Sequence, residues 1–243
     1  MQDFILNRDF WSSVNLFSET RKFDDFSLIS LCKMAVDNRV FSVSVPAENV
    51  DSVWEWLELS DVKLCAVINN YMGKMSVEDM FRRIKAVVNN GADIVEVALP
   101  KETFDVDVEN IPPQLDDMLC AISEAKGVKK IKVTMETAWM KNSSKLKGVI
   151  YLLSKYKVDI VKTASGNWEE NSRLEHLNAI LEEAKSSGLA VDFIPELYMD
   201  KSNKFIFDDA GRLGGYILGV DEAKNGGLTL SCSMQEFSKI IAK

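Results

Sequence analysis

The chain has 243 residues, of which 47% are hydrophobic and 27% are charged, and its formal net charge is −8 at pH 7. This length and hydrophobic content are enough to bury one sizeable core, and they match the usual size of a single α/β barrel. A surface with this net negative charge repels nucleic acid and anionic membranes, so we expect neither as a partner. The sequence starts without a signal-peptide pattern and holds no apolar stretch long enough to span a bilayer, which favours a cytoplasmic protein.

Short apolar runs alternate with helical patterns from one end of the chain to the other. The predicted strands cover residues 14–18, 40–45, 63–69, 93–99, 129–135, 158–163, 190–195 and 228–232. Apolar stripes with a helical period lie at residues 77–88, 115–122, 146–153 and 174–184. Ser76 is the predicted N-cap of the first of these helices, and Gly91 and Gly188 follow the ends of the first and the last.

Strands that alternate with helices predict right-handed crossovers and a parallel sheet. Eight strands in about this length favour a closed (β/α)8 barrel, the TIM barrel, over an open doubly wound sheet. No linker, low-complexity segment or second domain interrupts the pattern, so we expect one domain over residues 1–243. Residues 196–227 are longer than a barrel needs there and predict a loop with several charged side chains.

Three of the predicted strands contain charged residues, although buried parallel strands are normally apolar throughout. One holds Glu96, the next holds Lys132, Thr134 and Glu136 on a single face, and the third holds Lys162 near its end. The helix-facing side of a barrel strand must be apolar, so we expect these side chains to point into the barrel. Ionisable groups near the carboxyl ends of barrel strands are typical of an active site, and the alternative is a structural ion cluster that fills the interior.

A buried lysine near a carboxylate indicates amine chemistry. Burial lowers the pKa of a lysine, and a neighbouring cation such as Lys132 would lower it further. The neutral amine attacks a carbonyl to form a Schiff base, whose iminium withdraws electrons during cleavage or formation of a carbon–carbon bond. The carboxylate then relays protons as a general acid and base.

Three segments resemble, in order and spacing, signature strands of the deoxyribose-phosphate aldolase family. They are Gly91-Ala-Asp-Ile-Val-Glu-Val, Lys132-Val-Thr-Met-Glu-Thr and Val158-Asp-Ile-Val-Lys-Thr-Ala-Ser-Gly, and Val67-Ile-Asn-Asn-Tyr-Met-Gly matches more loosely. The resemblance, which runs from about residue 20 to about residue 195, implies a class I aldolase that cleaves 2-deoxyribose 5-phosphate or a related aldol substrate. It places Lys162 on the Schiff-base lysine, Lys132 on the lysine of the fifth strand, and Glu96 on the proton-relaying aspartate.

The resemblance also implies which residues contact the substrate, a small phosphorylated sugar or aldehyde. We expect these contacts from Asn69, Thr134, Glu136, Thr163, Ser231 and Ser233. We expect the phosphate near residues 231–233, because a helix predicted to begin about Met234 would offer backbone N–H groups to an anion there.

The chain departs from the family on the seventh strand. Ile194 stands where the family carries a second active-site lysine, and Glu196 and Leu197 stand near its phosphate-binding glycines. Ser231 and Ser233 remain on the eighth strand, without the glycine of that turn. The missing lysine predicts slow cleavage at neutral pH, a rate that rises toward alkaline pH, and faster imine formation in an Ile194→Lys variant.

The composition of the chain excludes several other enzyme classes. Its one histidine, His176, cannot provide the several ligands of a catalytic zinc or a convincing hydrolase base, and its charged neighbours predict an exposed position. No G-x-G-x-x-G follows a strand, so nicotinamide chemistry is excluded and we expect no cofactor or metal. The four cysteines form no C-x-x-C pair, which is typical of reduced thiols in the cytoplasm.

Two functions remain open from the sequence. The first is a working class I aldolase in deoxyribonucleotide catabolism, favoured by Lys162, Lys132 and Glu96. The second is a catalytically impaired barrel that binds a ligand or a partner protein, favoured by Ile194. A homodimer is compatible with either function.

Overall fold

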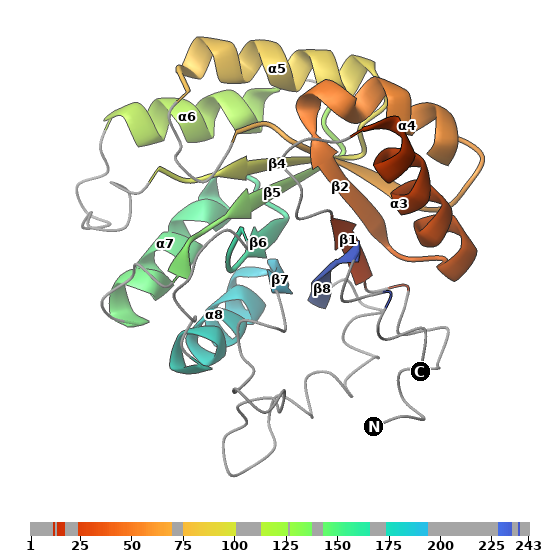
Figure 1. Ribbon diagram of the computed structural model, residues 1–243. Coiled ribbons are helices and arrows are strands. Elements are labelled where there is room, and N and C mark those ends of the chain that lie inside the picture. Colours follow the sequence, from red (N-terminus) through yellow and green to blue (C-terminus); the bar gives the residue numbers. More distant parts are fainter. Residues whose placement is uncertain are drawn as a thin grey trace.

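The strands of the protein close into a parallel barrel in the computed structural model (Figure 1). The structure describes residues 12, 14–17, 24–69, 75–100, 113–125, 127–137, 143–165, 174–193, 228–234 and 238. Within them the strands are β1 (Val14–Phe17), β2 (Ser42–Pro46), β3 (Lys63–Val67), β4 (Ile94–Ala98), β5 (Lys130–Thr134), β6 (Ile160–Lys162), β7 (Ala190–Phe193) and β8 (Leu228–Ser233). They follow one another in chain order around the barrel, and β8 pairs with β1 with Ser231 opposite Asn15. The predicted (β/α)8 barrel is confirmed.

Helices surround the barrel on its outside (Figure 1). They are α3 (Asp25–Asn38), the short 3-10 helix η1 (Ala47–Asn49), α4 (Val50–Leu57), α5 (Val77–Asn89), α6 (Pro113–Glu124), α7 (Ser143–Lys155) and α8 (Leu174–Ser187). The four predicted helical stripes lie in α5 to α8. As expected, Ser76 caps α5, because its side chain accepts a hydrogen bond from the backbone N–H of Asp79. The helices α3 and α4 were not predicted from the sequence.

The hydrophobic core lies between the strands and these helices. Val95 and Val97 of β4 are fully buried in it, and Glu96 between them belongs to the opposite face of the strand. The same alternation holds in β5, where Val133 belongs to the core and Lys132 to the interior of the barrel. Because the outward faces of β4 and β5 are apolar, Glu96 and Lys132 are directed toward the barrel axis.

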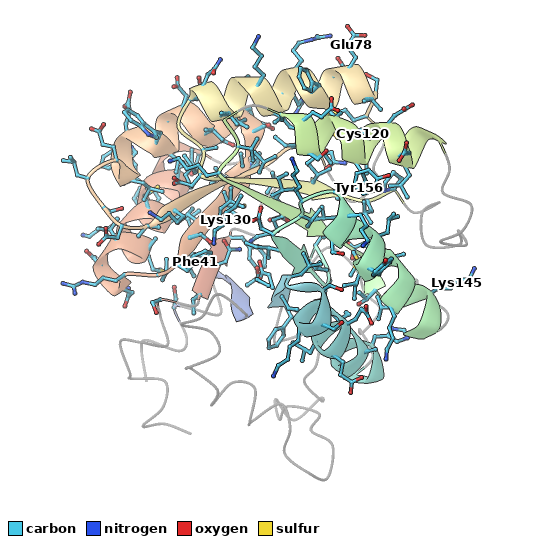
Figure 2. All side chains as sticks on the ribbon, turned by 180° about the vertical axis from the view of Figure 1, so that it is seen from behind. Phe41, Glu78, Cys120, Lys130, Lys145 and Tyr156 are labelled. Carbon is cyan, nitrogen blue, oxygen red and sulfur yellow. The ribbon has the colours of Figure 1, made fainter. Side chains whose placement is uncertain are left out.

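Two lysines near the amino end of β5 differ in exposure because of their positions along the strand. Lys130 is exposed, and its Nζ lies 5.9 Å from the centroid of the Phe41 ring (Figure 2). Lys132, two residues further along, has no exposed surface. A charged group at the strand start keeps its hydration, whereas the one in the barrel interior needs a partner of opposite charge.

The expectation of an exposed His176 is wrong. Its side chain is 1% exposed, and its Nδ1 lies 3.1 Å from the carbonyl oxygen of Thr137. His176 shares one face of α8 with Ile180 and Ala184, both fully buried, since residues four apart in a helix are neighbours on its surface. The buried face of the helix was therefore a better guide to its burial than its neighbours in the sequence.

The end of α5 gives the first testable prediction. Gly91 has a φ of 94°, and a Cβ placed there would overlap the indole ring of Trp54. A Gly91→Ala variant should therefore lose roughly 1–2 kcal/mol of unfolding free energy from backbone strain, and more from displacement of the ring. Urea denaturation measures the loss. The matched control is Gly188→Ala, where φ is 73° and nothing lies within 4 Å of the new Cβ. Equal losses in the two variants would contradict a role for Trp54.

Candidate active site

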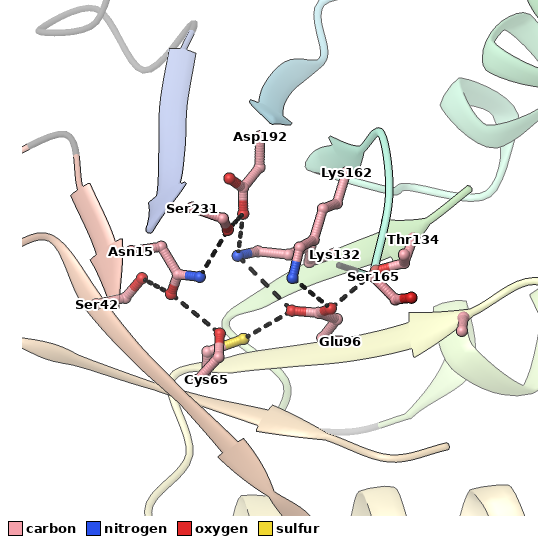
Figure 3. Close-up of polar contacts among 12 residues, drawn as sticks. Asn15, Ser42, Cys65, Glu96, Lys132, Thr134, Lys162, Ser165, Asp192 and Ser231 are labelled. Carbon is pink, nitrogen blue, oxygen red and sulfur yellow. Dashed lines mark hydrogen bonds and ion pairs between the residues drawn. The ribbon is translucent and has the colours of Figure 1, made fainter. Parts of the chain in front are cut away.

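Four ionisable side chains from four successive strands meet inside the barrel. Glu96 comes from β4, Lys132 from β5, Lys162 from β6 and Asp192 from β7 (Figure 3). All four are buried. Charged groups in such a position are stable only when they pair with one another and satisfy their hydrogen bonds.

Lys162 forms the first of two ion pairs. It is the last residue of β6, is 3% exposed, and donates from Nζ to Oε1 of Glu96 over 3.1 Å. Thr134 donates its hydroxyl to the same oxygen over 2.8 Å. The ring of Phe17 from β1 lies 5.4 Å from Nζ, on which it acts through a cation–π contact. The amine is thus held between a carboxylate and an aromatic ring at the carboxyl end of its strand.

Lys132 forms the second ion pair. Its Nζ lies 2.6 Å from Oδ2 of Asp192 and 3.8 Å from Oε2 of Glu96. Burial acts to lower the pKa of Lys132, but the carboxylate of Asp192, with Cys65 and Glu96, raises it above its ordinary value. The sequence predicted Lys132 as a cation beside Lys162, and the structure shows that it is paired with Asp192.

Asp192 also belongs to this cluster, although the sequence patterns did not single it out. It stands between Val191 and Phe193 in a buried strand, which is the same signal that identified Glu96. The prediction for this strand concerned the lysine missing at position 194 and did not include Asp192. Its Oδ2 also accepts a hydrogen bond from the hydroxyl of Ser231 over 3.0 Å.

The carboxylate of Glu96 contacts both lysines. Burial acts to raise its pKa, but the positive charges of Lys162 and Lys132, with the hydrogen bond from Thr134, lower the pKa to about 2. Glu96 is therefore ionised at neutral pH. It lies where it can accept a proton from a group bound at Lys162 and return it.

The lowered pKa of Glu96 predicts acid sensitivity. A carboxylate whose pKa is lower in the folded than in the unfolded protein stabilises the fold above its unfolded value, and this contribution is lost as the pH falls through the folded value. The shift from 4.5 to about 2 corresponds to about 3 kcal/mol, lost between about pH 5 and pH 2. Urea denaturation across this range measures it. The Glu96→Gln variant should show a shallower slope, and parallel slopes would contradict the assignment.

Neutral polar residues continue the network toward the first strands (Figure 3). Asn15 donates from Nδ2 to the hydroxyl oxygen of Ser231 over 2.9 Å, and its Oδ1 accepts from the hydroxyls of Ser42 and Ser44. The thiol of Cys65 donates to Oε2 of Glu96 over 3.7 Å, and burial raises its pKa to about 12. Cys65 is therefore a neutral donor at physiological pH.

The predicted substrate-binding residues divide into two groups. Thr134 and Ser231 belong to the network around Glu96 and Asp192. Asn69 instead joins β3 to β4, because its side chain both donates to and accepts from the backbone of Ala98. Glu136 accepts from the backbone N–H of Ser165, 3.0 Å away, beyond the end of β6. These contacts define positions only, so the substrate-binding roles stay predictions.

Other predicted features lie partly or wholly outside the described residues. Thr163 is buried, and its hydroxyl has no hydrogen-bond partner within the described part of the chain. Ser233, the last residue of β8, pairs through its backbone with Phe17 of β1, and its side chain lies outside the described structure. Ile194 and residues 196–227 lie outside the described residues altogether.

Two further searches cover only the described ranges. No cluster of three or more His, Cys, Asp or Glu residues that could hold a metal ion occurs there. No helix within those ranges is long and apolar enough to cross a membrane.

Comparisons with known proteins agree with this geometry. Deoxyribose-phosphate aldolase of Clostridioides difficile is 26% identical over 200 residues, which cover 82% of this chain and 88% of the relative. The enzyme of the same name from Clostridium tetani is 29% identical over 163 residues, covering 61% of this chain and 72% of the relative. The crystal structure of deoxyribose phosphate aldolase from Aeropyrum pernix shares the fold, with a TM-score of 0.72, 17% identity, and coverage of 95% and 92% of the two chains. No protein-family model matches the chain.

The fold and the buried side chains together are typical of one class of protein, the barrel enzymes that use a Schiff-base lysine. A closed (β/α)8 barrel with a lysine in contact with a carboxylate has the groups that Schiff-base chemistry requires. Within this class, the chain is similar to deoxyribose-phosphate aldolases, and the resemblance of its strand segments to that family is confirmed.

Proposed function

We propose that the protein is a class I aldolase that cleaves a carbon–carbon bond of 2-deoxyribose 5-phosphate or of a closely related aldol substrate. The observation that carries the proposal is the contact between Lys162 and Glu96, with Nζ and Oε1 3.1 Å apart in the buried interior of the barrel. The names of the similar proteins support the same substrate class. A non-catalytic barrel is not favoured, because the similar proteins are named as aldolases.

In the proposed reaction, the neutral amine of Lys162 attacks the aldehyde carbon of the open-chain sugar. Loss of water leaves an iminium, which withdraws electrons from the adjacent carbons. Glu96 accepts the proton of the hydroxyl group on the carbon that becomes the new aldehyde, and the carbon–carbon bond breaks to leave an enamine on Lys162. Return of a proton to the enamine carbon and hydrolysis of the iminium release the second aldehyde and restore the amine.

Lys132 has a supporting role in this scheme. Its Nζ is 3.8 Å from the second oxygen of Glu96, so its positive charge stabilises the ionised form of that carboxylate between proton transfers. Thr134 fixes the first oxygen through its hydroxyl. The two groups keep Glu96 oriented toward Lys162.

Other parts of the assignment belong to the same proposal. We place the substrate phosphate beside residues 231–233, at the end of β8. We also propose one catalytic domain over residues 1–243 that works in the cytoplasm, which agrees with the free thiols of Cys32, Cys65 and Cys120.

Cleavage of 2-deoxyribose 5-phosphate tests the proposed function. We expect the released aldehydes to form slowly at pH 7, below about 1 per second, and faster toward pH 9, because Ile194 replaces the expected second lysine. The measurement is a coupled assay of aldehyde release across this pH range, with Ile194→Lys as the variant expected to be faster. Unphosphorylated deoxyribose is the control substrate, and it should show a higher KM. No cleavage of either sugar at any pH would contradict the proposed function.

A further inference from the structure

Asp192 is a buried carboxylate that the proposed reaction does not use. It has no exposed surface, and one of its oxygens, Oδ2, accepts both from Nζ of Lys132 and from the hydroxyl of Ser231. Its other oxygen, Oδ1, has no hydrogen-bond partner within the described ranges. Burying a second carboxylate at this depth costs free energy unless a group of opposite charge pairs with it.

The groups around the two lysines indicate what the carboxylate of Asp192 does. Each of four strands contributes one: Glu96 from β4, Lys132 from β5, Lys162 from β6 and Asp192 from β7. The remaining strands contribute neutral groups in the described structure: Asn15, Ser42, Ser44, Cys65 and Ser231. Glu136, two residues beyond the end of β5, accepts from the backbone N–H of Ser165.

Two lysines therefore have access to one carboxylate, Glu96, and the distances show how they share it. Lys162 is 3.1 Å from Glu96, at hydrogen-bond distance, whereas Lys132 is 3.8 Å from it and only 2.6 Å from Asp192. Asp192 thus supplies Lys132 with a closer partner than Glu96.

We propose that Asp192 is a positioning residue: it holds Lys132 away from Glu96, so that Glu96 stays paired with Lys162 and the interior stays balanced in charge. The inference rests on the proposed Schiff-base function of Lys162, and Asp192 acts on that function only through Lys132. Without the carboxylate of Asp192, Lys132 turns to Glu96, and an uncompensated positive charge is left beside Lys162.

An Asp192→Asn variant tests this positioning role. An uncompensated cation favours the neutral form of a neighbouring amine, so the pH profile of labelling at Lys162 by acetaldehyde and cyanoborohydride should move to lower pH by about one unit. The double variant Lys132→Met with Asp192→Asn removes both charges and should return the midpoint to within about half a unit of the native value. Asp192→Glu keeps the charge and should also keep the native midpoint.

A purely structural role for Asp192 gives a different result. The variants would then lose stability while the midpoint of labelling stayed at its native value, and that result would overturn the proposal. If Asp192→Asn does not fold, Lys132→Met is compared with the double variant. The single variant keeps an unpaired carboxylate and should have the higher midpoint, so equal midpoints would overturn the proposal as well.

Failure of the proposed function can be told apart from failure of this inference. If the native chain takes no label at Lys162, the function fails, and the pairing is then tested through stability alone. Urea midpoints should be lower in Lys132→Met and in Asp192→Asn than in the double variant, because each single change leaves a buried charge without its partner. Losses that simply add would refute the pairing.

Discussion

Replacing Lys162 with methionine is expected to abolish both turnover and covalent labelling by aldehydes. The proposed reaction passes through an imine on this amine, and the other buried lysine of the described structure, Lys132, is held by Asp192 at 2.6 Å and cannot replace it. Loss of a covalent nucleophile typically lowers turnover by more than a thousandfold. Aldehyde release from 2-deoxyribose 5-phosphate, and the mass shift after borohydride reduction, measure the two effects.

The matched control for this variant is Lys130→Met. Lys130 lies on β5, two residues before Lys132, but is exposed at the amino end of the strand beside Phe41 (Figure 2). This variant should keep native turnover and native labelling. Labelling that persists in Lys162→Met but disappears in Lys130→Met would show that the reactive lysine had been misassigned.

Replacing Glu96 with glutamine is expected to separate imine formation from bond cleavage. Glutamine is close to glutamate in size and cannot accept the substrate proton, and loss of a general base typically costs about a hundredfold to ten-thousandfold in rate. Turnover should fall by this factor, while borohydride still labels Lys162 with acetaldehyde. Rates of aldehyde release and of labelling, measured on the same preparation, give the comparison.

The control for Glu96 is a shorter carboxylate. Glu96→Asp introduces the aspartate that the resemblance to the deoxyribose-phosphate aldolase family implies at this position. The aspartate variant should therefore keep much more activity than Glu96→Gln. Native turnover in the glutamine variant would contradict the proton-relay role. Equal losses in the aspartate and glutamine variants would mean that the position of the side chain, and not its charge, is what matters.

The sequence predicted the barrel and the charged side chains that point into it, because both leave a strong pattern. An apolar strand interrupted by one ionisable residue has only one face on which that residue is tolerable, and Glu96, Lys132 and Lys162 all followed this rule. Asp192 followed the same rule and was overlooked. Its importance depends on a contact with a residue 60 positions away, which a pattern within one strand does not reveal.

Other features were harder to predict for physical reasons. Helix α4 is eight residues long, so its apolar repeat is too short to stand out, and two of its tryptophans, Trp54 and Trp56, are partly exposed. His176 was assigned from its neighbours in the sequence, although burial on a helix depends on residues three and four positions away. The contact of the Asn69 amide with the backbone of Ala98 was not predicted, because it joins residues 29 positions apart, and its expected contact with substrate stays a prediction.

The central claim is that Lys162 is the amine that forms the imine, and peptide mapping tests it most directly. The native protein is incubated with acetaldehyde, reduced with borohydride, digested, and analysed for peptides that gain an ethyl group. We expect one dominant site of modification, at Lys162, and no modification of Lys132, which is buried in its pair with Asp192. A native chain that gains the label at another lysine, with Lys162 unmodified, would contradict it.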